Sequence, residues 1–284
     1  MKIIFAGTPK FASEHLSILL GGEHEIVAVL TQPDRKSGRG KKISFSEVKE
    51  IALENDLKVL QPASLKDVEI QKSINNLKPD IILVVAYGLL IPKTVLDIPK
   101  LGCINIHASL LPRWRGASPI ESCIAAGDSK SGITMMKMSE GLDEGPILKK
   151  FVCHLDEKET LETLEKKFIG MSSENLLQFL KDYENKKISE VIQPTTGSTY
   201  ANKIDNTFKR INWAGQTAGE IENKIRALNP KYGAFTYLGE ERIKLFSASP
   251  KKNNSSVEPG LILINKEGSL EVGCKDSSLL EIET

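Results

Sequence analysis

Short apolar runs alternate with amphipathic stretches through the first two thirds of the chain. The apolar runs predict buried strands at residues 2–6, 26–30, 58–60, 80–86 and 101–107. Elsewhere apolar residues recur every three or four positions, which predicts helices at residues 11–19, 47–53, 65–77 and 118–126. Because alternating strands and helices assemble through right-handed crossovers, the pattern predicts an α/β fold with a mostly parallel sheet and helices on both of its faces.

Two more strand-like segments, residues 132–138 and 146–154, flank a glycine-rich loop at 139–145. We expect them to be neighbouring strands at one edge of the same sheet. A long amphipathic helix is predicted at residues 159–183, where apolar side chains keep the helical period.

The helical period is lost after this helix, and the chain turns rich in threonine and glycine from Gln193 onward. This composition predicts an extended linker. We therefore expect a large domain at residues 1–189, a linker at 190–206 and a small domain at 207–284. The small domain has a helical stretch and several short strands separated by turns, at residues 218–227, 234–238, 242–248, 261–264 and 270–272. Short strands at this spacing are typical of a small barrel or open sandwich.

Composition places the chain among ordinary globular proteins. It has 284 residues, of which 40% are hydrophobic and 26% charged, with a formal net charge of +1. No signal peptide, membrane span or closely spaced cysteine pair is evident, so we expect a cytoplasmic protein with reduced thiols and no metal. We also expect a monomer, although no sequence feature determines the oligomeric state. Charge is uneven locally: residues 206–253 hold nine Lys or Arg and four Glu, whereas residues 254–284 are acidic.

Positive charge also gathers in the loop at residues 33–42, where Arg39, Lys41 and Lys42 stand beside Gly38 and Gly40. A solvated loop is one interpretation of such a run. The other is a flexible loop that becomes ordered around phosphate groups, and we favour it because glycine freedom and concentrated charge occur together.

Two polar side chains end the strand at 101–107. Asn105 and His107 are two residues apart and therefore project from the same face, and Pro112 prevents a simple continuation of the strand. Ligands of open α/β sheets bind at such strand ends, but the two side chains could equally satisfy loop backbone. The first strand is not followed by G-x-G-x-x-G, which disfavours a nicotinamide-dependent oxidoreductase.

The loop at 139–145 carries Asp143 between two glycines. If Asp143 meets Asn105 and His107 in one cleft, the set suits acyl transfer. An amide can stabilise an oxyanion, an imidazole can move protons, and a carboxylate can orient the imidazole. No serine or cysteine in the stretch is an obvious nucleophile, so direct attack by a substrate amine on an acyl donor is the simpler chemistry.

These motifs resemble the folate-dependent formyltransferase family. The resemblance rests on Asn105-x-His107, on residues 109–116 (SLLPRWRG) and on residues 141–146 (GLDEGP). The opening residues 5–12 (FAGTPKFA), the basic loop and the basic small domain narrow it to the members that formylate initiator methionyl-tRNA. The resemblance implies a Rossmann-like sheet and a C-terminal OB-like barrel, here shortened because the family usually continues past Thr284.

The resemblance also implies roles for single residues. Formyl would pass from 10-formyltetrahydrofolate to the α-amino group of methionyl initiator tRNA in translation initiation, with catalysis by Asn105, His107 and Asp143. The residues implied in binding the folate are Ser109, Leu110, Leu111 and Pro112, with the pterin near Tyr87, Gly88 and Leu89. Arg39, Lys41 and Lys42 would contact the tRNA acceptor stem, and the C-terminal barrel would follow the tRNA backbone.

Two alternatives stay open. One is a folate-dependent formyltransferase that acts on a small amine, against which the basic loop and basic small domain argue. The other is a non-catalytic tRNA-binding protein on the same scaffold, which the intact set of Asn105, His107 and Asp143 disfavours.

Overall fold

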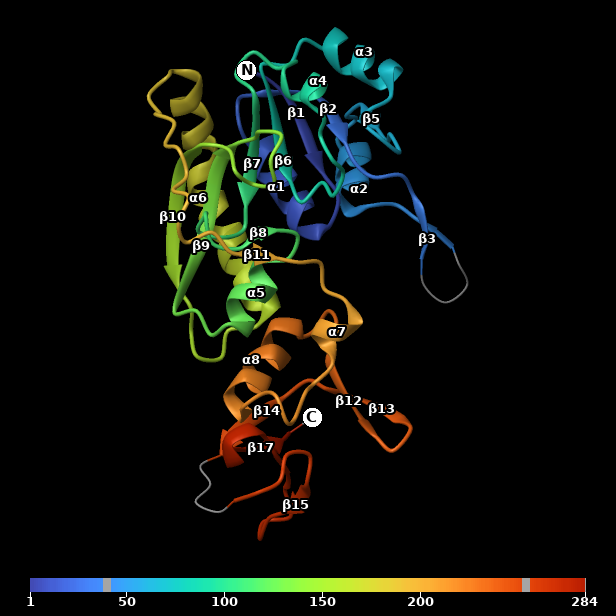
Figure 1. The fold of residues 1–284 in the computed structure, drawn as a ribbon. Coiled ribbons are helices and arrows are strands. Elements are labelled where there is room, and N and C mark those ends of the chain that lie inside the picture. Colours follow the sequence, from blue (N-terminus) through green and yellow to red (C-terminus); the bar gives the residue numbers. More distant parts are fainter. Residues whose placement is uncertain (38–41, 252–255, 284) are drawn as a thin grey trace. The chain divides into compact units, whose positions relative to one another are not determined.

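The chain forms two compact units, described here from a computed structural model that covers residues 1–37, 42–251 and 256–283 (Figure 1). The first unit comprises residues 1–117, 132–152 and 167–200. The second comprises residues 118–131, 153–166 and 201–284. Segments from the middle of the chain thus contribute to both units, and the predicted boundaries at 189 and 207 stay predictions.

A seven-stranded sheet forms the centre of the first unit (Figure 1). Its strands, in spatial order, are β10 (Ile147–His154), β9 (Lys130–Lys137), β7 (Cys103–His107), β6 (Ile81–Val85), β1 (Lys2–Gly7), β2 (Glu25–Leu30) and β5 (Val59–Leu60). The strands from β7 to β5 are parallel, and β9 pairs with β7 in the antiparallel direction. The mostly parallel sheet is therefore confirmed, with β9 and β10 at one edge.

Helices cover both faces of this sheet. They are α1 (Lys10–Leu20), α2 (Glu47–Glu54), α3 (Val68–Asn76), α4 (Lys93–Leu96) and α6 (Leu161–Glu184). Ile4 and Ile82 pack with Ile74 of α3 and Val95 of α4 on one face. Strand residues alternate between faces, and Ile3 and Phe5, which point the other way, are also fully buried. Apolar residues on both faces explain why these strands read as continuous hydrophobic runs.

His15 joins two helices inside the first unit. Its Nδ1–H donates to the carbonyl of Phe11 at 2.7 Å, so Nε2 can accept from the Ser172 hydroxyl on α6 at 2.8 Å. Burial lowers the pKa of His15 to about 4. A neutral, fully enclosed imidazole with both nitrogens bonded is a structural residue.

Two short paired strands that we did not predict stand before and after residues 38–41 in the chain. Residues of β3 (Arg35–Ser37) pair with β4 (Lys42–Ser44) in the antiparallel direction. Five of the six paired residues are polar or charged, so no alternation of apolar residues marked these segments as strands. At the base of this β3–β4 hairpin Asp34 accepts from Lys49 at 2.6 Å and from Gln61 at 2.8 Å, and these bonds lower the pKa of that carboxyl.

The second unit combines helices with antiparallel strands. The helices are α5 (Pro119–Ala125), α7 (Asn206–Lys209) and α8 (Ala218–Leu228), and η1 (Lys275–Ser277) is a 3-10 turn. Strands β12 (Ala234–Leu238) and β13 (Glu241–Leu245) form one pair. A four-stranded sheet has the order β14 (Ala248–Lys251), β17 (Leu279–Ile282), β16 (Leu270–Gly273) and β15 (Ile262–Ile264). These antiparallel sheets are consistent with the small barrel we expected.

The strand boundaries in the second unit differ in part from the prediction. The strand expected at 242–248 is two strands, β13 and β14, and the strand at 279–282 was not predicted. β17 is the second strand of its sheet and contributes the buried Leu279 and Leu280. Four residues are too few to show a strand period, so its pairing with β14 and β16 had no local signal.

None of the helices in the described ranges is long and apolar enough to cross a membrane. The four cysteines are free thiols, and three of them, Cys103, Cys123 and Cys274, are buried. Burial raises the pKa of each of these three thiols, so they are inert packing residues.

Candidate active site

Strand β7 presents Asn105 and His107 on one face of the sheet. The register pairs Asn105 with Met136 and His107 with Thr134 on β9. The His107 side chain is only 5% exposed, whereas Asn105 is half-buried. Since β6 runs parallel beside β7, the carboxyl ends of both strands meet at the same edge of the sheet.

Asp143 reaches this pair by a turn that folds back over the sheet. β9 ends with Lys137 opposite Ile104, near the start of β7, and the chain then reverses before β10. Asp143 Oδ1 accepts from the Asn105 amide at 3.3 Å, and Oδ2 lies 3.7 Å from Nδ1 of His107. The structure thus brings all three predicted catalytic side chains together.

Backbone groups complete the cluster. The N–H of Gly116 donates to Asp143 Oδ2 at 2.8 Å, and Nε2 of His107 lies 2.9 Å from the carbonyl oxygen of Trp114. A carbonyl only accepts, so Nε2 carries the hydrogen in the neutral ring and Nδ1 holds the lone pair. The imidazole therefore turns its basic nitrogen toward the Asp143 carboxylate.

Sequence reasoning missed two side chains that support this cluster, Gln193 and Thr199. Gln193 donates to the carbonyls of Asp143 and Gly145, at 2.7 and 2.8 Å, and accepts from the guanidinium of Arg115. Thr199 accepts from the N–H of Trp114 through its hydroxyl, at 2.9 Å. Gln193 and Thr199 lie in the segment we predicted to be a linker, and their polar composition gave no signal for these contacts.

Gly145 is required by close packing of the Asp143 turn. A Cβ at this position would collide with the backbone carbonyl oxygen of Lys137, which cannot move without disturbing β9. Gly145→Ala is therefore expected to lower the free energy of unfolding by about 1–3 kcal/mol and to displace Asp143, with a loss of activity. Urea unfolding and the transfer rate measure the two effects.

Gly141→Ala is the matched control in the same turn. Its Cβ would meet the side chain of Glu144 and no backbone atom nearby, and this half-exposed side chain can rotate away. We expect this variant to keep its stability and activity. Equal damage from both substitutions would contradict the assigned role of Gly145.

The predicted folate-binding residues 109–112 form a turn that an internal hydrogen bond and two buried side chains stabilise. The Ser109 hydroxyl donates to the carbonyl of Arg113 at 2.6 Å, and the side chains of Ser109 and Leu111 are fully buried. Leu110 and Pro112 are half-buried. Only Leu110 and Pro112 therefore offer side-chain surface to a ligand.

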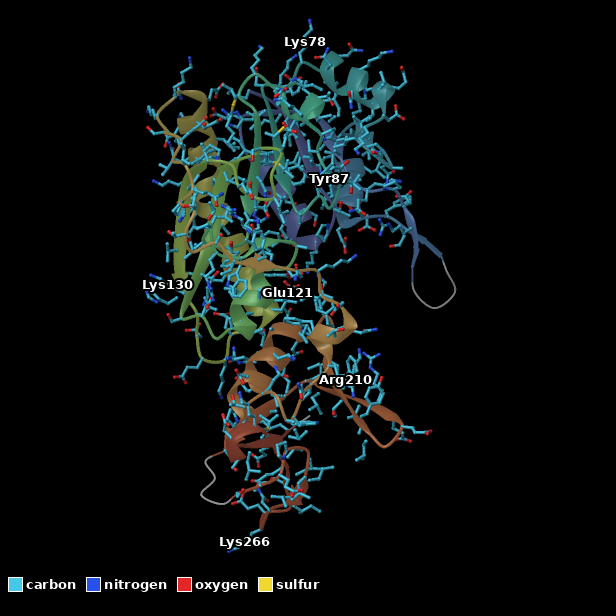
Figure 2. The ribbon with its side chains drawn as sticks, viewed as in Figure 1. Lys78, Tyr87, Glu121, Lys130, Arg210 and Lys266 are labelled. Carbon is cyan, nitrogen blue, oxygen red and sulfur yellow. The ribbon has the colours of Figure 1, made fainter. Side chains whose placement is uncertain are left out.

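The predicted pterin pocket at residues 87–89 lies directly after β6. The ring of Tyr87, marked in Figure 2, is 2% exposed and packs within the apolar core, and burial raises its pKa to about 12. Its backbone carbonyl accepts from Thr8 and Gln32. Gly88 is exposed at a φ of +78°, and Leu89 is half-buried. Among residues 87–89, the surface open to a ligand therefore consists of the Gly88 backbone and the Leu89 side chain.

The predicted tRNA contacts fall mostly outside the described residues. Arg39 and Lys41 belong to the range 38–41, and Lys42 is placed only as backbone at the start of β4. In the chain, residues 38–41 follow β3 and precede β4, and these two strands pair in the antiparallel direction (Figure 1).

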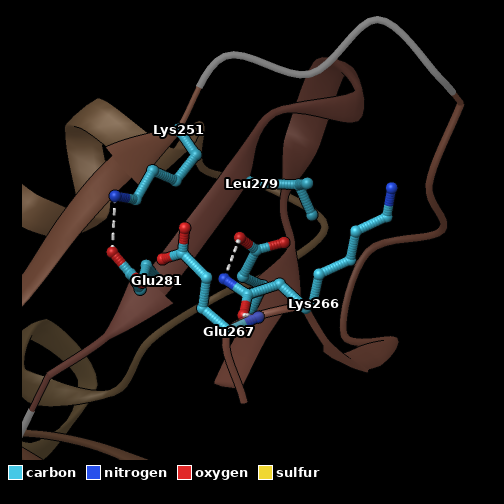
Figure 3. A pocket seen from close by; sticks show the side chains of 7 residues that line it. Lys251, Lys266, Glu267, Leu279 and Glu281 are labelled. Carbon is cyan, nitrogen blue, oxygen red and sulfur yellow. Dashed lines mark hydrogen bonds and ion pairs between the residues drawn. The ribbon is translucent and has the colours of Figure 1, made fainter. Parts of the chain in front are cut away.

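The described residues contain no group of three or more His, Cys, Asp or Glu that could hold a metal ion. A surface depression of about 490 Å³ lies on the four-stranded sheet of the second unit (Figure 3). Lys251 and Glu281 in its wall pair at 2.6 Å, and Asn265 donates to Glu271 at 3.1 Å. Four of its lining side chains thus pair with one another, and the depression offers no reactive set comparable to the one around His107.

Comparison with known proteins identifies the family. The family model "Formyl transferase" matches residues 1–180, and "Formyl transferase, C-terminal domain" matches residues 203–284. Among curated relatives, the methionyl-tRNA formyltransferase of Marinobacter nauticus is 43% identical over 98% of this chain and 89% of its own length. That of Pseudomonas entomophila is 44% identical with the same coverage.

Solved structures share the fold at lower identity. An N-formyltransferase from Helicobacter canadensis, in complex with folinic acid and dTDP-3-aminofucose, matches with a TM-score of 0.72 at 17% identity, over 100% of this chain and 99% of that one. WlaRD, a sugar 3N-formyl transferase, matches with a TM-score of 0.71 at 19% identity, over 100% and 97%. The two family models and the full-length relatives show that this chain belongs to the formyl transferase family.

Proposed function

We propose that this protein transfers the formyl group of 10-formyltetrahydrofolate to the α-amino group of methionyl initiator tRNA, as a monomer in the cytoplasm. The observation that carries the proposal is the convergence of Asn105, His107 and Asp143 at the end of β7. Relatives that are 43–44% identical over nearly the whole chain bear the name methionyl-tRNA formyltransferase, which supports the choice of acceptor.

Proton transfer is the first requirement of this reaction. The acceptor amine forms a bond to the formyl carbon, the bond from that carbon to the folate nitrogen breaks, and one proton passes from the amine to the folate nitrogen. Nδ1 of His107 holds the lone pair that can take this proton, because Nε2 donates to Trp114. Asp143, 3.7 Å away, stabilises the resulting imidazolium.

Charge on the formyl oxygen is the second requirement. The amide of Asn105 carries two hydrogens, and its one hydrogen bond among the described residues goes to Asp143. The other hydrogen can donate to the oxygen as negative charge develops there. Asn105 is half-buried, so it can meet substrate while keeping its contact to Asp143.

The folate would lie at the carboxyl ends of β6 and β7. The exposed backbone of Gly88 lets a flat ring system approach closely, and Leu89, Leu110 and Pro112 contribute the partly exposed apolar surface that such rings prefer. Ser109 and Leu111 would act indirectly, because their buried side chains shape the turn that presents Leu110 and Pro112.

Cations over aromatic rings in the second unit support a nucleic-acid partner. Arg210, labelled in Figure 2, lies 5.5 Å from the ring centre of Tyr237, and Arg242 lies 3.7 Å from that of Phe235, a ring that is itself buried. Tyr237 is 48% exposed on β12. Exposed aromatic rings beside arginines bind both the bases and the phosphates of RNA. The acidic four-stranded sheet is not such a surface, so we place the tRNA contact on β12 and β13.

The β3–β4 hairpin supplies a test of the acceptor. Replacing Arg39, Lys41 and Lys42 with Ala is expected to raise KM for the tRNA while KM for the folate stays unchanged. If the three side chains contact phosphates, the slope of log affinity against log salt becomes shallower by about 2–3. Steady-state kinetics and tRNA binding at several salt concentrations measure both effects.

Three exposed lysines of the same unit provide the control. Replacing Lys58, Lys66 and Lys72 with Ala removes the same charge away from the hairpin and should leave tRNA use unchanged. An equal loss from both triple variants would mean that net charge alone matters. An equal loss of folate and tRNA use in the hairpin variant would make the hairpin structural.

A further inference from the structure

We propose that Gln193 is a positioning residue that holds Asp143 against His107. This inference deepens the proposed function and rests on it. Gln193 touches none of the three catalytic side chains directly. It acts through the backbone of the turn between β9 and β10, which carries Asp143.

The amide of Gln193 is fully used, and its orientation is fixed by its partners. Nε2 donates to the carbonyls of Asp143 at 2.7 Å and Gly145 at 2.8 Å. Oε1 accepts from Nη2 and Nε of Arg115, at 2.8 and 3.2 Å. Arginine only donates and carbonyls only accept, so the reversed amide would lose all four bonds. Gln193 is 6% exposed, so water cannot readily replace them.

The backbone that carries Gln193 is itself anchored to the sheet. Val191 and Ile147 exchange two backbone hydrogen bonds of 2.8 Å each at the start of β10. Glu190 pairs with Lys137 at 2.7 Å at the end of β9. Gln193 therefore reaches the turn from a fixed point on both strands that the turn connects.

The Asp143 turn needs such a support. Asp143 has a φ of +50°, in the left-handed region that costs an L-residue free energy, although Asp adopts it more readily than most. The neighbouring Leu142 is 58% exposed, so packing of the next side chain does not hold the turn. Two hydrogen bonds to carbonyls on either side of Glu144 fix the direction in which Asp143 projects. A displacement of about 1 Å at a catalytic group can cost roughly 100-fold in rate.

Gln193 could instead act by holding the guanidinium of Arg115. One substitution separates this role from the positioning of Asp143. Gln193→Glu still accepts from Arg115 but cannot donate to the Asp143 and Gly145 carbonyls, which it repels. Gln193→Met, of similar length and without a charge, loses both contacts and serves if the Glu variant does not fold. Gln178→Glu makes the same change from Gln to Glu at an exposed position of α6, and it is the matched control.

We expect Gln193→Glu and Gln193→Met to lower kcat by about 10–100-fold, with KM for folate and tRNA within about twofold of wild type. Gln178→Glu should keep the wild-type kcat. In an Asp143→Asn background, Gln193→Glu should lower kcat by less than about threefold, because residues that act through each other are not additive. A wild-type kcat in Gln193→Glu, or full additivity with Asp143→Asn, would overturn the proposal.

A second readout does not depend on the acceptor. The ¹⁵N resonance of His107 Nδ1 should move in Gln193→Glu toward its value in Asp143→Asn, because both variants remove the carboxylate from Nδ1. An unchanged resonance would overturn the role of Gln193 even in an active enzyme. If the wild type does not formylate the tRNA but the resonance moves as expected, the proposed function fails and the positioning role stands.

Discussion

Replacing Asp143 with Asn is expected to lower kcat for formyl transfer by roughly 10²–10⁴-fold, the usual contribution of a positioned proton-transfer group, because His107 needs this carboxylate to act as one. The substitution keeps the size of the side chain and an oxygen that can accept from the N–H of Gly116. It removes the negative charge 3.7 Å from Nδ1 of His107. Without that charge, His107 loses the partner that stabilises its protonated form.

Steady-state kinetics at saturating folate and tRNA measure this effect. Both KM values should stay within a few-fold of wild type, since the lost interaction forms during the reaction rather than on binding. Asp97→Asn, at an exposed residue paired with Lys93, is the control and should have no effect. A kcat for Asp143→Asn within threefold of wild type would mean that His107 does not need the Asp143 carboxylate to take the proton.

Asn105→Ala is expected to lower kcat by roughly 10²–10³-fold, the usual cost of one oxyanion donor. The variant loses the hydrogen that would face the formyl oxygen and also the 3.3 Å contact to Asp143 Oδ1. Asn75→Ala, at an exposed position on α3, is the control for the same substitution.

Single-turnover transfer rates give this effect without interference from product release. A rate for Asn105→Ala close to wild type would place the oxyanion donor elsewhere. A rise in KM for the folate with kcat unchanged would make Asn105 a binding residue instead.

The fold of the first unit was predictable because its signals are local. Residues of β1 and β6 are buried on both faces, so each strand is a run of apolar side chains. The β3–β4 hairpin lacked such a signal, since five of its six paired residues are polar or charged. β17 is four residues long, and only its pairing with β14 and β16 defines it as a strand, so the sequence alone did not reveal it.

The residues of the candidate site also divide into those with a local sequence signal and those without one. Asn105 and His107 stand out because they are polar residues two apart at the end of a buried strand, and Asp143 because two glycines flank it. Gln193 acts through partners 48–78 positions away in the chain, which no local pattern reveals. The N–H of Gly116 and the carbonyl of Trp114 are backbone groups, so residue type carries no information about them.

One measurement tests the central claim most directly. Labelled 10-formyltetrahydrofolate is offered to the wild type with methionyl initiator tRNA, and in parallel with an amino-sugar nucleotide as a small amine. We predict that formyl appears on the methionyl α-amino group only, and that Asp143→Asn loses this transfer. Transfer to the small amine with none to the tRNA, or tRNA binding without any transfer, would contradict the account.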